Sequence, residues 1–587
     1  MRSSTPALLA LPLVLPLVLP LALLLGLATP ILARGDEPVP LSQRLADIHQ
    51  RSTEIEIELH SAEEYADAAE KLRALLTDLA ELDALASSDS ASADDEPSFD
   101  ERLDLRLLRS QLEIRRFEIE DAALWQLVPV RYLQLFTTDS LLLRPCAAGS
   151  EAVDAAIREL EALPQILQNA RANLTRPAAT WTENAIATAR YAELLLESEL
   201  PAACIEAPNR PALLEAAAAA LPAVRAYAEW MRSDLLPRSD RSPAWAPELI
   251  ETYRRVQEWL PDPPLEGFLR IAEEDERATR DAMRQLAKRI HPSGDLRRVW
   301  ELMKDETPPW SEVRPMAERY VEMTAEWLRD PGDGGGAHLL EIPERFDYGT
   351  VIATPMARRI LSFGGASYGP TVAGRISGYY VLTPIEPWIS PEEQSQRLRS
   401  YNPYWTHVIS YHEWVGHNVQ RAWATAGAER HRPSPIRRSY RSAYLSQAWS
   451  FYIEKLFEDH GYYETLPHME ALKTRMARLQ MRMWRIQRIL TKLRMAQGEM
   501  TFDQAMQAYI DEIGMEPANA LLEVQRDSQS PASPGREILG ERLILEMWDE
   551  YRQRLGEHAR LRDFHQALLE HGELPLPAIR QILFRSE

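Results

Sequence analysis

Apolar residues recur at helical spacing along most of this chain, and this periodicity limits the fold more than any other feature. Leu41, Leu45 and Ile48 form one apolar stripe, and a second stripe follows at 72–79. Such spacing places the apolar side chains on one face of an α-helix. The alanine run at 216–220 is also typical of a helix. The sequence therefore predicts a mainly α fold.

The pattern changes between residues 340 and 388, where β-branched and aromatic residues are interspersed with Gly and Pro. The stretch Ile376–Leu382 has the composition of a strand. Helical patterns return after 393, and no boundary divides the chain cleanly. We expect a single large helical domain over 34–587, with a small β element at 340–388 just ahead of helices at 405–460.

The first 33 residues are predicted to be a targeting segment that does not belong to this domain. Arg2 precedes an almost wholly apolar run from Leu8 to Leu27, and Ala33 offers a small residue for cleavage. The run is long enough to span a bilayer, so an uncleaved N-terminal anchor is the alternative to a signal peptide. Either reading predicts export to the periplasm or cell envelope, with membrane contact only through this segment.

The composition argues against nucleic acid as a partner. The chain has 66 Lys and Arg against 88 Asp and Glu, a formal net charge of −22. Binding to phosphate backbones depends on basic patches, which such a charge disfavours. The only cysteines are Cys146 and Cys204, so a disulfide scaffold is excluded.

The strongest functional signal is the sequence His-Glu-Trp-Val-Gly-His at 412–417. It puts two histidines and a carboxylate within one short stretch. Neutral imidazoles suit Zn²⁺, and a Glu beside the first histidine can take a proton from water at the metal. His412, Glu413 and His417 are therefore the predicted metal ligands and general base, with Glu413 as the base.

The spacing of these histidines demands a distorted helix. Zincin histidines usually lie four residues apart on one helix face. His412 and His417 are five apart, which turns them about 140° from each other on a regular helix. A π-bulge would bring them together, and Gly416 lies where that distortion is easiest. We expect Gly416→Val to remove metal by straining only this bulge, without unfolding the chain.

A metal held by two histidines needs a third protein ligand. Gln447 and Glu454 are seven residues apart in the next predicted helix, and hence on one face. Glu454 could reach the metal as a carboxylate ligand, whereas Gln447 is a weaker oxygen donor. The alternative for Glu454 is a solvated position beside an aromatic core stripe, and the residues alone leave both open.

Two further residues are predicted at the catalytic site. Tyr380 ends the expected strand before the motif helix, where a tyrosine can donate to an oxyanion; the alternative is a half-buried strand residue. Arg526 can pair with a substrate carboxylate through two parallel hydrogen bonds; the alternative is a structural ion pair. His407 is interpreted as a helix-surface imidazole and His565 as a packing residue.

These stretches together resemble the bacterial family called domain of unknown function 885 (DUF885), relatives of zinc-dependent peptidases. The resemblance covers nearly the whole chain after the targeting segment. It is carried by the run Trp125–Tyr132, the motif at 411–420, Ala448-Trp449 and the run 563–577. It implies a zincin-like, mainly α domain in which a small β element lies beside a zinc cleft.

The chain departs from the family pattern near the motif. The family reads His-Glu-x-x-Pro-Gly-His-His; this chain lacks the Pro and has Asn418 for the last His. The family's Glu-Gly-Trp is Gln447-Ala448-Trp449 here, so the expected third-ligand carboxylate is an amide. The six-residue motif itself resembles that of the third dipeptidyl peptidase, in which this spacing supports a zinc site.

Two functions follow from these observations. The first is an exported zinc peptidase that cleaves a peptide substrate, with Zn²⁺ held by His412, His417 and either Glu454 or Gln447. The second is a non-catalytic envelope protein that keeps the fold with a degenerate metal site. Gln447 favours the second function, and retention of Glu413 beside a histidine favours the first.

Export can be tested directly. Because the apolar start reads as a targeting segment, residues from about 35 onward are expected in the cell envelope. Mass spectrometry of the protein from the envelope fraction should find either a chain beginning near residue 35 or the full-length anchored form. An intact Met1 on protein from the cytosol would contradict the prediction.

Overall fold

The computed structural model describes residues 39–86, 96–143, 151–203, 205–207, 209–344, 346–362, 364–368, 376–532 and 534–585. The predicted targeting segment at 1–33 and both cysteines lie outside these residues. Within the described part of the chain, no helix combines the length and apolar content that crossing a bilayer requires.

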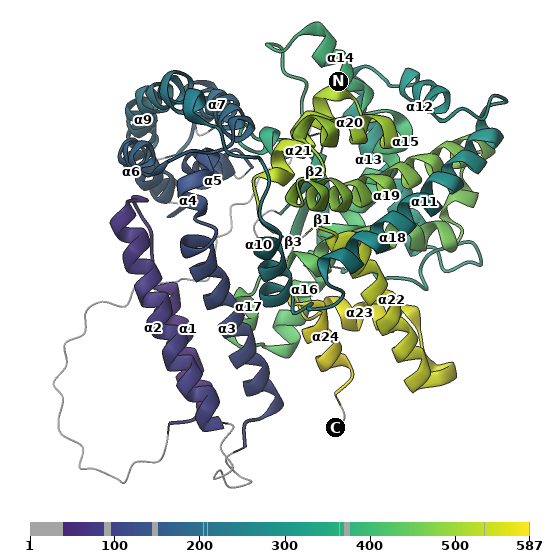
Figure 1. Ribbon diagram of the computed structural model, residues 1–587. Coiled ribbons are helices and arrows are strands. Elements are labelled where there is room, and N and C mark those ends of the chain that lie inside the picture. Colours follow the sequence, from purple (N-terminus) through teal and green to yellow (C-terminus); the bar gives the residue numbers. More distant parts are fainter. Residues whose placement is uncertain are drawn as a thin grey trace, which may run out of the picture.

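The described residues are mainly helical, as the apolar spacing predicted (Figure 1). At the amino end α1 (Leu41–Thr53), α2 (Ala62–Ala86) and α3 (Phe99–Glu120) pack against one another. A capping box starts α3: the Ser98 hydroxyl accepts from the Glu101 backbone N–H, and the Glu101 side chain returns to the Ser98 backbone. The short helices α4 (Leu124–Leu127) and α5 (Phe136–Ser140) follow.

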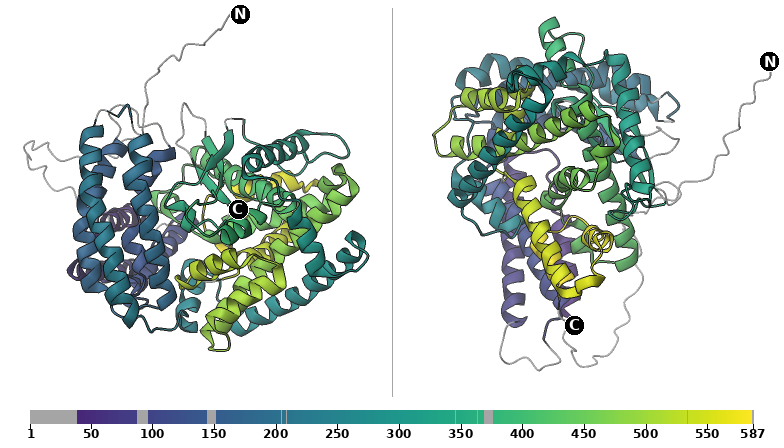
Figure 2. Two further views of the ribbon diagram at one scale, coloured as in Figure 1. Left: turned by 90° about the horizontal axis from the view of Figure 1, so that it is seen from above. Right: turned by 90° about the vertical axis from the view of Figure 1, so that its right-hand side faces the viewer.

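A second group of helices forms a bundle with its own apolar core. It contains α6 (Glu151–Asn173), α7 (Ala179–Leu194) and α9 (Arg210–Trp230), seen as the blue helices of Figure 2. The alanine run of α9 packs towards α6, and Ala220 is fully buried. Alanines with no side chain beyond Cβ allow such close helix packing. The short α8 (Leu200–Ala203) completes this part, whereas Ile250 of α10 (Pro247–Thr252) packs into the larger core.

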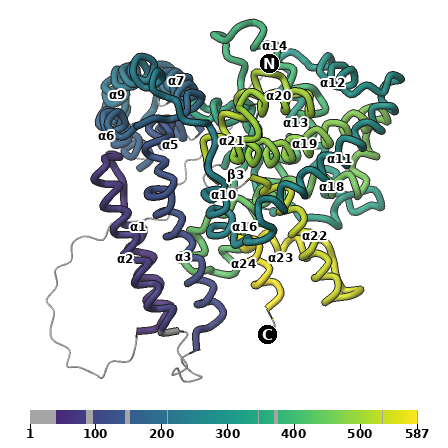
Figure 3. Tube along the Cα trace, viewed as in Figure 1, coloured from purple at the N-terminus to yellow at the C-terminus, as the bar shows by residue number. Residues whose placement is uncertain are grey.

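The helices after residue 260 form the larger body, with α18 and α19 in its middle (Figure 3). Both are buried over most of their length, and Trp449 of α18 is fully enclosed. Helices that are buried on nearly every side belong in a core. The helices are α11 (Leu265–Ile290), α12 (Leu296–Asp305), α13 (Trp310–Arg329), α14 (Pro391–Arg399), α15 (Pro403–Tyr411), α16 (Gln420–His431), α17 (Pro435–Ser439), α18 (Ala443–Asp459), α19 (His468–Ala496), α20 (Phe502–Ile513), α21 (Pro517–Ser528), α22 (Arg536–Leu555), α23 (Leu561–Leu569) and α24 (Leu576–Leu583).

The described strands β1 (Phe346–Ile352), β2 (Gly364–Tyr368) and β3 (Ile376–Leu382) all lie within the 340–388 stretch. They form one sheet in the order β1-β3-β2. β1 runs parallel to β3, and β2 runs antiparallel to it. β3, which has the predicted bounds, is therefore the central strand, and β2 is an edge. Both pack against the segment that carries the histidines.

That segment is the π-helix η8 (His412–Val419), placed between α15 and α16. The distortion predicted from the histidine spacing is thus confirmed. Gly416 has a second role that the spacing did not reveal. A Cβ on Gly416 would lie 2.4 Å from Cβ and 2.6 Å from Cα of Ser450 on α18. The glycine therefore lets two buried helices touch, and the expectation that Gly416→Val strains only the local bulge is wrong.

Gly416→Ala should lower stability by about 1–3 kcal/mol, because even one methyl group forces η8 and α18 apart. Differential scanning calorimetry of the purified protein would measure the loss as a lower melting temperature. Gly334→Ala is the matched control, since no atom lies within 4 Å of a Cβ built there. Equal melting temperatures for the two variants would contradict the packing role of Gly416.

Candidate metal centre

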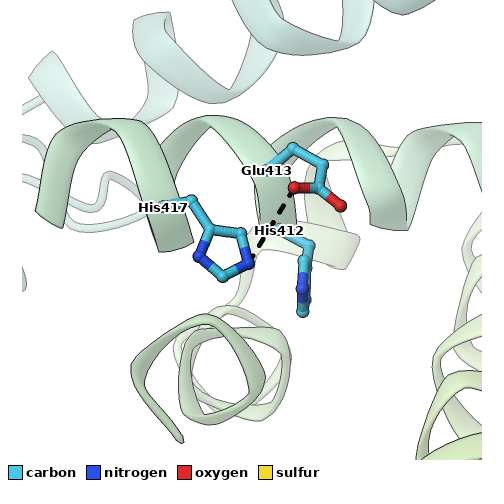
Figure 4. A group of neighbouring side chains, drawn as sticks. All are labelled: His412, Glu413 and His417. Atoms are coloured by element: carbon cyan, nitrogen blue, oxygen red, sulfur yellow. Dashed lines mark ion pairs between the residues drawn. The ribbon is translucent and has the colours of Figure 1, made fainter. Parts of the chain in front are cut away.

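The histidines and carboxylate of the motif come together on one side of η8 (Figure 4). The ligand-capable atoms of His412, Glu413 and His417 all lie within 4.8 Å of one another. Nε2 of His417 is 3.9 Å from Oε2 of Glu413. The imidazole centroids are 5.2 Å apart, with their planes at 74°. The extra residue in the π-turn therefore cancels the angular separation that a regular helix would give.

Both imidazoles are held from α18 through the same ring nitrogen. Nδ1 of His412 is 2.7 Å from Oε1 of Glu454, and Nδ1 of His417 is 2.8 Å from Oγ of Ser446. The contact at Nδ1 leaves Nε2 of His417 to face Glu413, and among the described residues Nε2 of His412 forms no ion pair of its own. A carboxylate on the rear nitrogen is the usual support of a metal-binding histidine. The structure thus places Glu454 behind His412 and outside the group of ligand atoms.

The protonation state of the histidines suits a metal. Burial, reinforced by the positive charge of Arg485, holds the pKa of His412 well below its usual value. Burial and the neighbouring His412 do the same to the pKa of His417. Both rings are therefore neutral near pH 7, which is the form that binds Zn²⁺. The donor set fits that ion.

The pKa of Glu413 is shifted upward, whereas the pKa values of the two histidines are shifted downward. Burial is the main cause that raises the pKa of its carboxyl to about 8; Arg485 opposes this rise, and the nearby Glu454 adds to it. A carboxyl whose pKa lies near neutrality can both accept and return a proton. A divalent cation beside Glu413 would favour the charged form and lower this pKa.

The cluster opens into a cavity of about 290 Å³. One wall is the edge strand β2, which contributes Gly364, Gly365, Ala366 and Tyr368. The Tyr368 hydroxyl donates to the backbone carbonyl of His417 at 3.4 Å, so β2 is joined directly to η8. The opposite wall comes from α18, α19 and α21.

Tyr380 does not reach this cavity. It lies on the central strand β3, is 1% exposed and is absent from the cavity lining. A Cβ on Gly364 would lie 3.1 Å from its ring, so the edge strand covers it. Tyr380 is thus enclosed behind the edge strand, and its role as an oxyanion donor stays a prediction.

The two positions that differ from the family pattern have different surroundings. Gln447 lines the cavity together with the cluster. Asn418 is fully buried and packs against Gly378 of β3, where an added Cβ would lie 2.7 Å from the Asn418 Cβ. Asn418 therefore takes no part in the cluster, and its difference from the family pattern concerns packing.

Arg526 lines the cavity but is already paired. Its guanidinium donates to Glu523 at 2.5 Å, and its side chain is 38% exposed. Glu523 also accepts from Nε of Arg488 at 2.8 Å. Burial alone would raise the pKa of Glu523, but Arg488 and Arg526 outweigh it and lower the pKa to about 2. This charge network forms the floor of the cavity.

The other histidines that the sequence singled out are structural. His407 is buried, not on the helix surface: its ring stacks on Tyr320 and its Nε2 lies 2.9 Å from the Tyr462 hydroxyl. His565 is buried as a packing residue, with Nδ1 2.7 Å from the carbonyl oxygen of Leu339. Neither lines the cavity.

Sequence reasoning missed several cavity residues. Ser446 and Tyr368 carry no pattern that would separate them from other polar surface positions. Arg485 and Arg488 lie on α19, where arginines at helical spacing are usually solvated; here both are buried in the cavity wall. The only available signal was the clustering of cations in an otherwise acidic chain.

The protein is a mainly helical one with a small sheet. The sheet lies beside the buried His-Glu-His cluster. The sequence matches the family described as "Bacterial protein of unknown function (DUF885)" over residues 46–583. The chain belongs to this family.

Two solved structures share the fold over nearly their whole length. A "putative lipoprotein of unknown function" from Shewanella oneidensis is 18% identical with a TM-score of 0.65; the alignment covers 93% of this chain and 97% of that one. A "putative lipoprotein" from Colwellia psychrerythraea is 14% identical with a TM-score of 0.67, covering 93% and 98%. No curated protein matches the chain.

Glu523 should make stability depend on pH. Its folded pKa of about 2 lies below the ordinary 4.5, so its contribution is full above 4.5 and is lost as the pH falls towards 2. Glu523→Gln should therefore cost on the order of 3 kcal/mol at pH 7 and progressively less in acid. Melting temperatures at pH 7 and pH 3 measure the change.

The exposed Glu429 of α16 supplies the matched control for this measurement. Glu429→Gln should change stability by no more than about 0.5 kcal/mol at either pH, because it removes no buried contact. A difference between wild type and Glu523→Gln that stays constant from pH 7 to pH 3 would contradict the network.

Proposed function

We propose that this protein is an exported, zincin-like zinc peptidase in which His412 and His417 hold Zn²⁺ through Nε2. The observation that carries the proposal is the convergence of two neutral imidazoles and Glu413 on one point of a cavity. The carboxylate of Glu454 on the rear nitrogen of His412 supports it further. Gln447, in the cavity wall, supplies the third protein oxygen.

When bound, Zn²⁺ would polarise the scissile carbonyl and acidify water beside it. Glu413 takes a proton from the attacking water and passes it to the leaving amine, so that a C–O bond forms as the C–N bond breaks. Glu454 and Ser446 keep the two imidazoles in place. The edge strand β2 offers unpaired backbone groups along which an extended peptide can lie.

The location follows from two observations. The predicted targeting segment calls for export, and both solved relatives are described as "putative" lipoproteins. We therefore place the protein in the periplasm or cell envelope, where its substrates would be exported or imported peptides.

The metal decides between this proposal and a non-catalytic envelope protein. Plasma mass spectrometry of zinc-treated protein should find one Zn²⁺ per chain, and His417→Ala should lose it. Glu413→Gln should keep the metal and lose about 10²–10⁴-fold in peptide hydrolysis, because it removes the base. His468→Ala is the control, since that exposed histidine at the start of α19 should have no effect.

Gln447→Glu extends the same test to the third ligand. A carboxylate is a better ligand than an amide for Zn²⁺, so this variant should bind zinc more tightly in competition with a chelator. Absence of zinc from both wild type and Gln447→Glu would refute the peptidase and leave the non-catalytic alternative.

A further inference from the structure

Arg485 is a buried cation that lacks a matching anion. It lies on α19, lines the cavity and is 5% exposed. Its Nη1 is 3.5 Å from the carbonyl oxygen of Met481, at the limit of a hydrogen bond. Its Nη2 is 3.9 Å from Oε1 of Glu454, and its Nε is buried without a hydrogen-bond partner among the described residues. A buried charge in this state is costly unless an anion joins it.

The neighbouring arginines of α19 do not share this deficit. Arg488 donates to Glu523 at 2.8 Å and to Glu537 at 2.6 Å. One turn before Arg485, Arg482 pairs with Glu541 at 2.8 Å and with Asp275 at 2.7 Å. Each of these cations therefore has two carboxylates within hydrogen-bond distance, whereas Arg485 has only Glu454, at 3.9 Å, as an ion-pair partner among the described residues.

The nearest carboxylate cannot serve Arg485 and its own partner equally. Oε1 of Glu454 is 2.7 Å from the His412 ring, much closer than its 3.9 Å distance from Arg485. A divalent cation bound to the histidines would add still more positive charge to this side of the cavity. Among the described residues no other carboxylate is paired with Arg485, so an anion from outside the chain would complete the arrangement.

We infer that Arg485 binds a carboxylate group of the substrate, so that the cavity takes peptides with a carboxylate next to the bond that is cleaved. This inference rests on the proposed peptidase function. The flat guanidinium fork matches a carboxylate through two parallel hydrogen bonds. Arg485 thus takes the role that the sequence assigned to Arg526, whose guanidinium is already held by Glu523.

The position of Arg485 indicates where that carboxylate lies along the peptide. Arg485 lines the same cavity as His412, Glu413 and His417. One peptide residue spans about 3.3–3.6 Å. On this inference, a free C-terminal carboxylate lies at Arg485 with the last peptide bond at the cluster, and the reaction removes the C-terminal residue. An Asp or Glu side chain is the other source of the same group.

The test uses the metal-free, full-length protein, so that it does not depend on hydrolysis. Ligand-observed NMR titrations compare three blocked alanine peptides: N-acetyl-trialanine, its C-terminal amide, and an amide in which the last residue is Asp. We expect the free acid to bind about tenfold more tightly than the plain amide. Tight binding of the Asp-containing amide would instead assign the side chain as the source of the carboxylate.

Three variants assign the effect to Arg485. Arg485→Met should abolish the preference for the acid, and Arg485→Lys should keep only part of it, because lysine has the charge without the fork. Arg526→Met, the matched control from the same cavity, should preserve the preference. Equal binding of all three peptides by the wild type, or an unchanged preference in Arg485→Met, would overturn the inference.

Thermal stability supplies a second readout that a merely structural arginine would not give. Arg485→Met removes an uncompensated buried charge and should leave the melting temperature unchanged or raise it. Arg488→Met strands Glu523 and Glu537 and should lower it. A large loss of stability in Arg485→Met would show that the arginine is satisfied within the fold and would also overturn the inference.

The inference and the proposed function fail in different ways. If the metal-free protein prefers the acid but no zinc binds, the carboxylate site stands and the peptidase does not. If the zinc-loaded protein cleaves acid and amide peptides equally well, the peptidase stands and the role of Arg485 does not.

Discussion

The close contact between η8 and α18 at Gly416 and Ser450 is the constraint on which the candidate site depends. The π-turn rotates His417 towards His412, but rotation alone would leave both rings loosely held. Because the two helices touch, Ser446 and Glu454 of α18 reach the rear nitrogens of the two imidazoles. The absence of a side chain at Gly416 thus helps to fix the positions of four side chains of the candidate site: His412, His417, Ser446 and Glu454.

The buried arginines of α19 are a second feature of this protein, and their burial costs desolvation free energy. Each ion pair costs desolvation, and an apolar core of the same volume would be as stable or more so. The ion pairs of Arg488 with Glu523 of α21 and Glu537 of α22 offset part of this desolvation free energy. Since these helices meet around the cavity floor, the network fixes their relative positions and so defines the cavity. Arg485 lies on the same helix but joins no two helices through close ion pairs. This difference is the reason for proposing that its charge is used by a ligand.

The sequence predicted the parts of the fold that local chemistry determines. Helical spacing identified the helices, the Gly-rich and β-branched stretch identified the region of the sheet, and a five-residue interval between His412 and His417 required the π-turn. Strand order was not predictable, because it depends on which edges pair after the chain has folded; the sequence therefore could not show that the edge strand covers Tyr380. The sequence identified Glu454 as a candidate third ligand, and in the structure it contacts Nδ1 of His412. A rotation by a fraction of a helical turn decides whether such a carboxylate faces a metal or the rear nitrogen of a histidine, and the sequence does not determine that rotation. The pairing of Arg485 could not be predicted, because its potential partners come from α18, α21 and α22.

The amide at Gln447 changes the charge of the cavity that Arg485 also lines. In the family pattern this position is a carboxylate, whose negative charge would face the same cavity and offset part of the arginine's positive charge. An amide at 447 weakens the hold on a metal, since it is a poorer ligand than a carboxylate. It also leaves the cavity more cationic, because no charge replaces the one removed. Under the proposed function, this difference would lower the affinity for zinc and raise the affinity for an anionic ligand, in agreement with a substrate that brings its own carboxylate to the cluster.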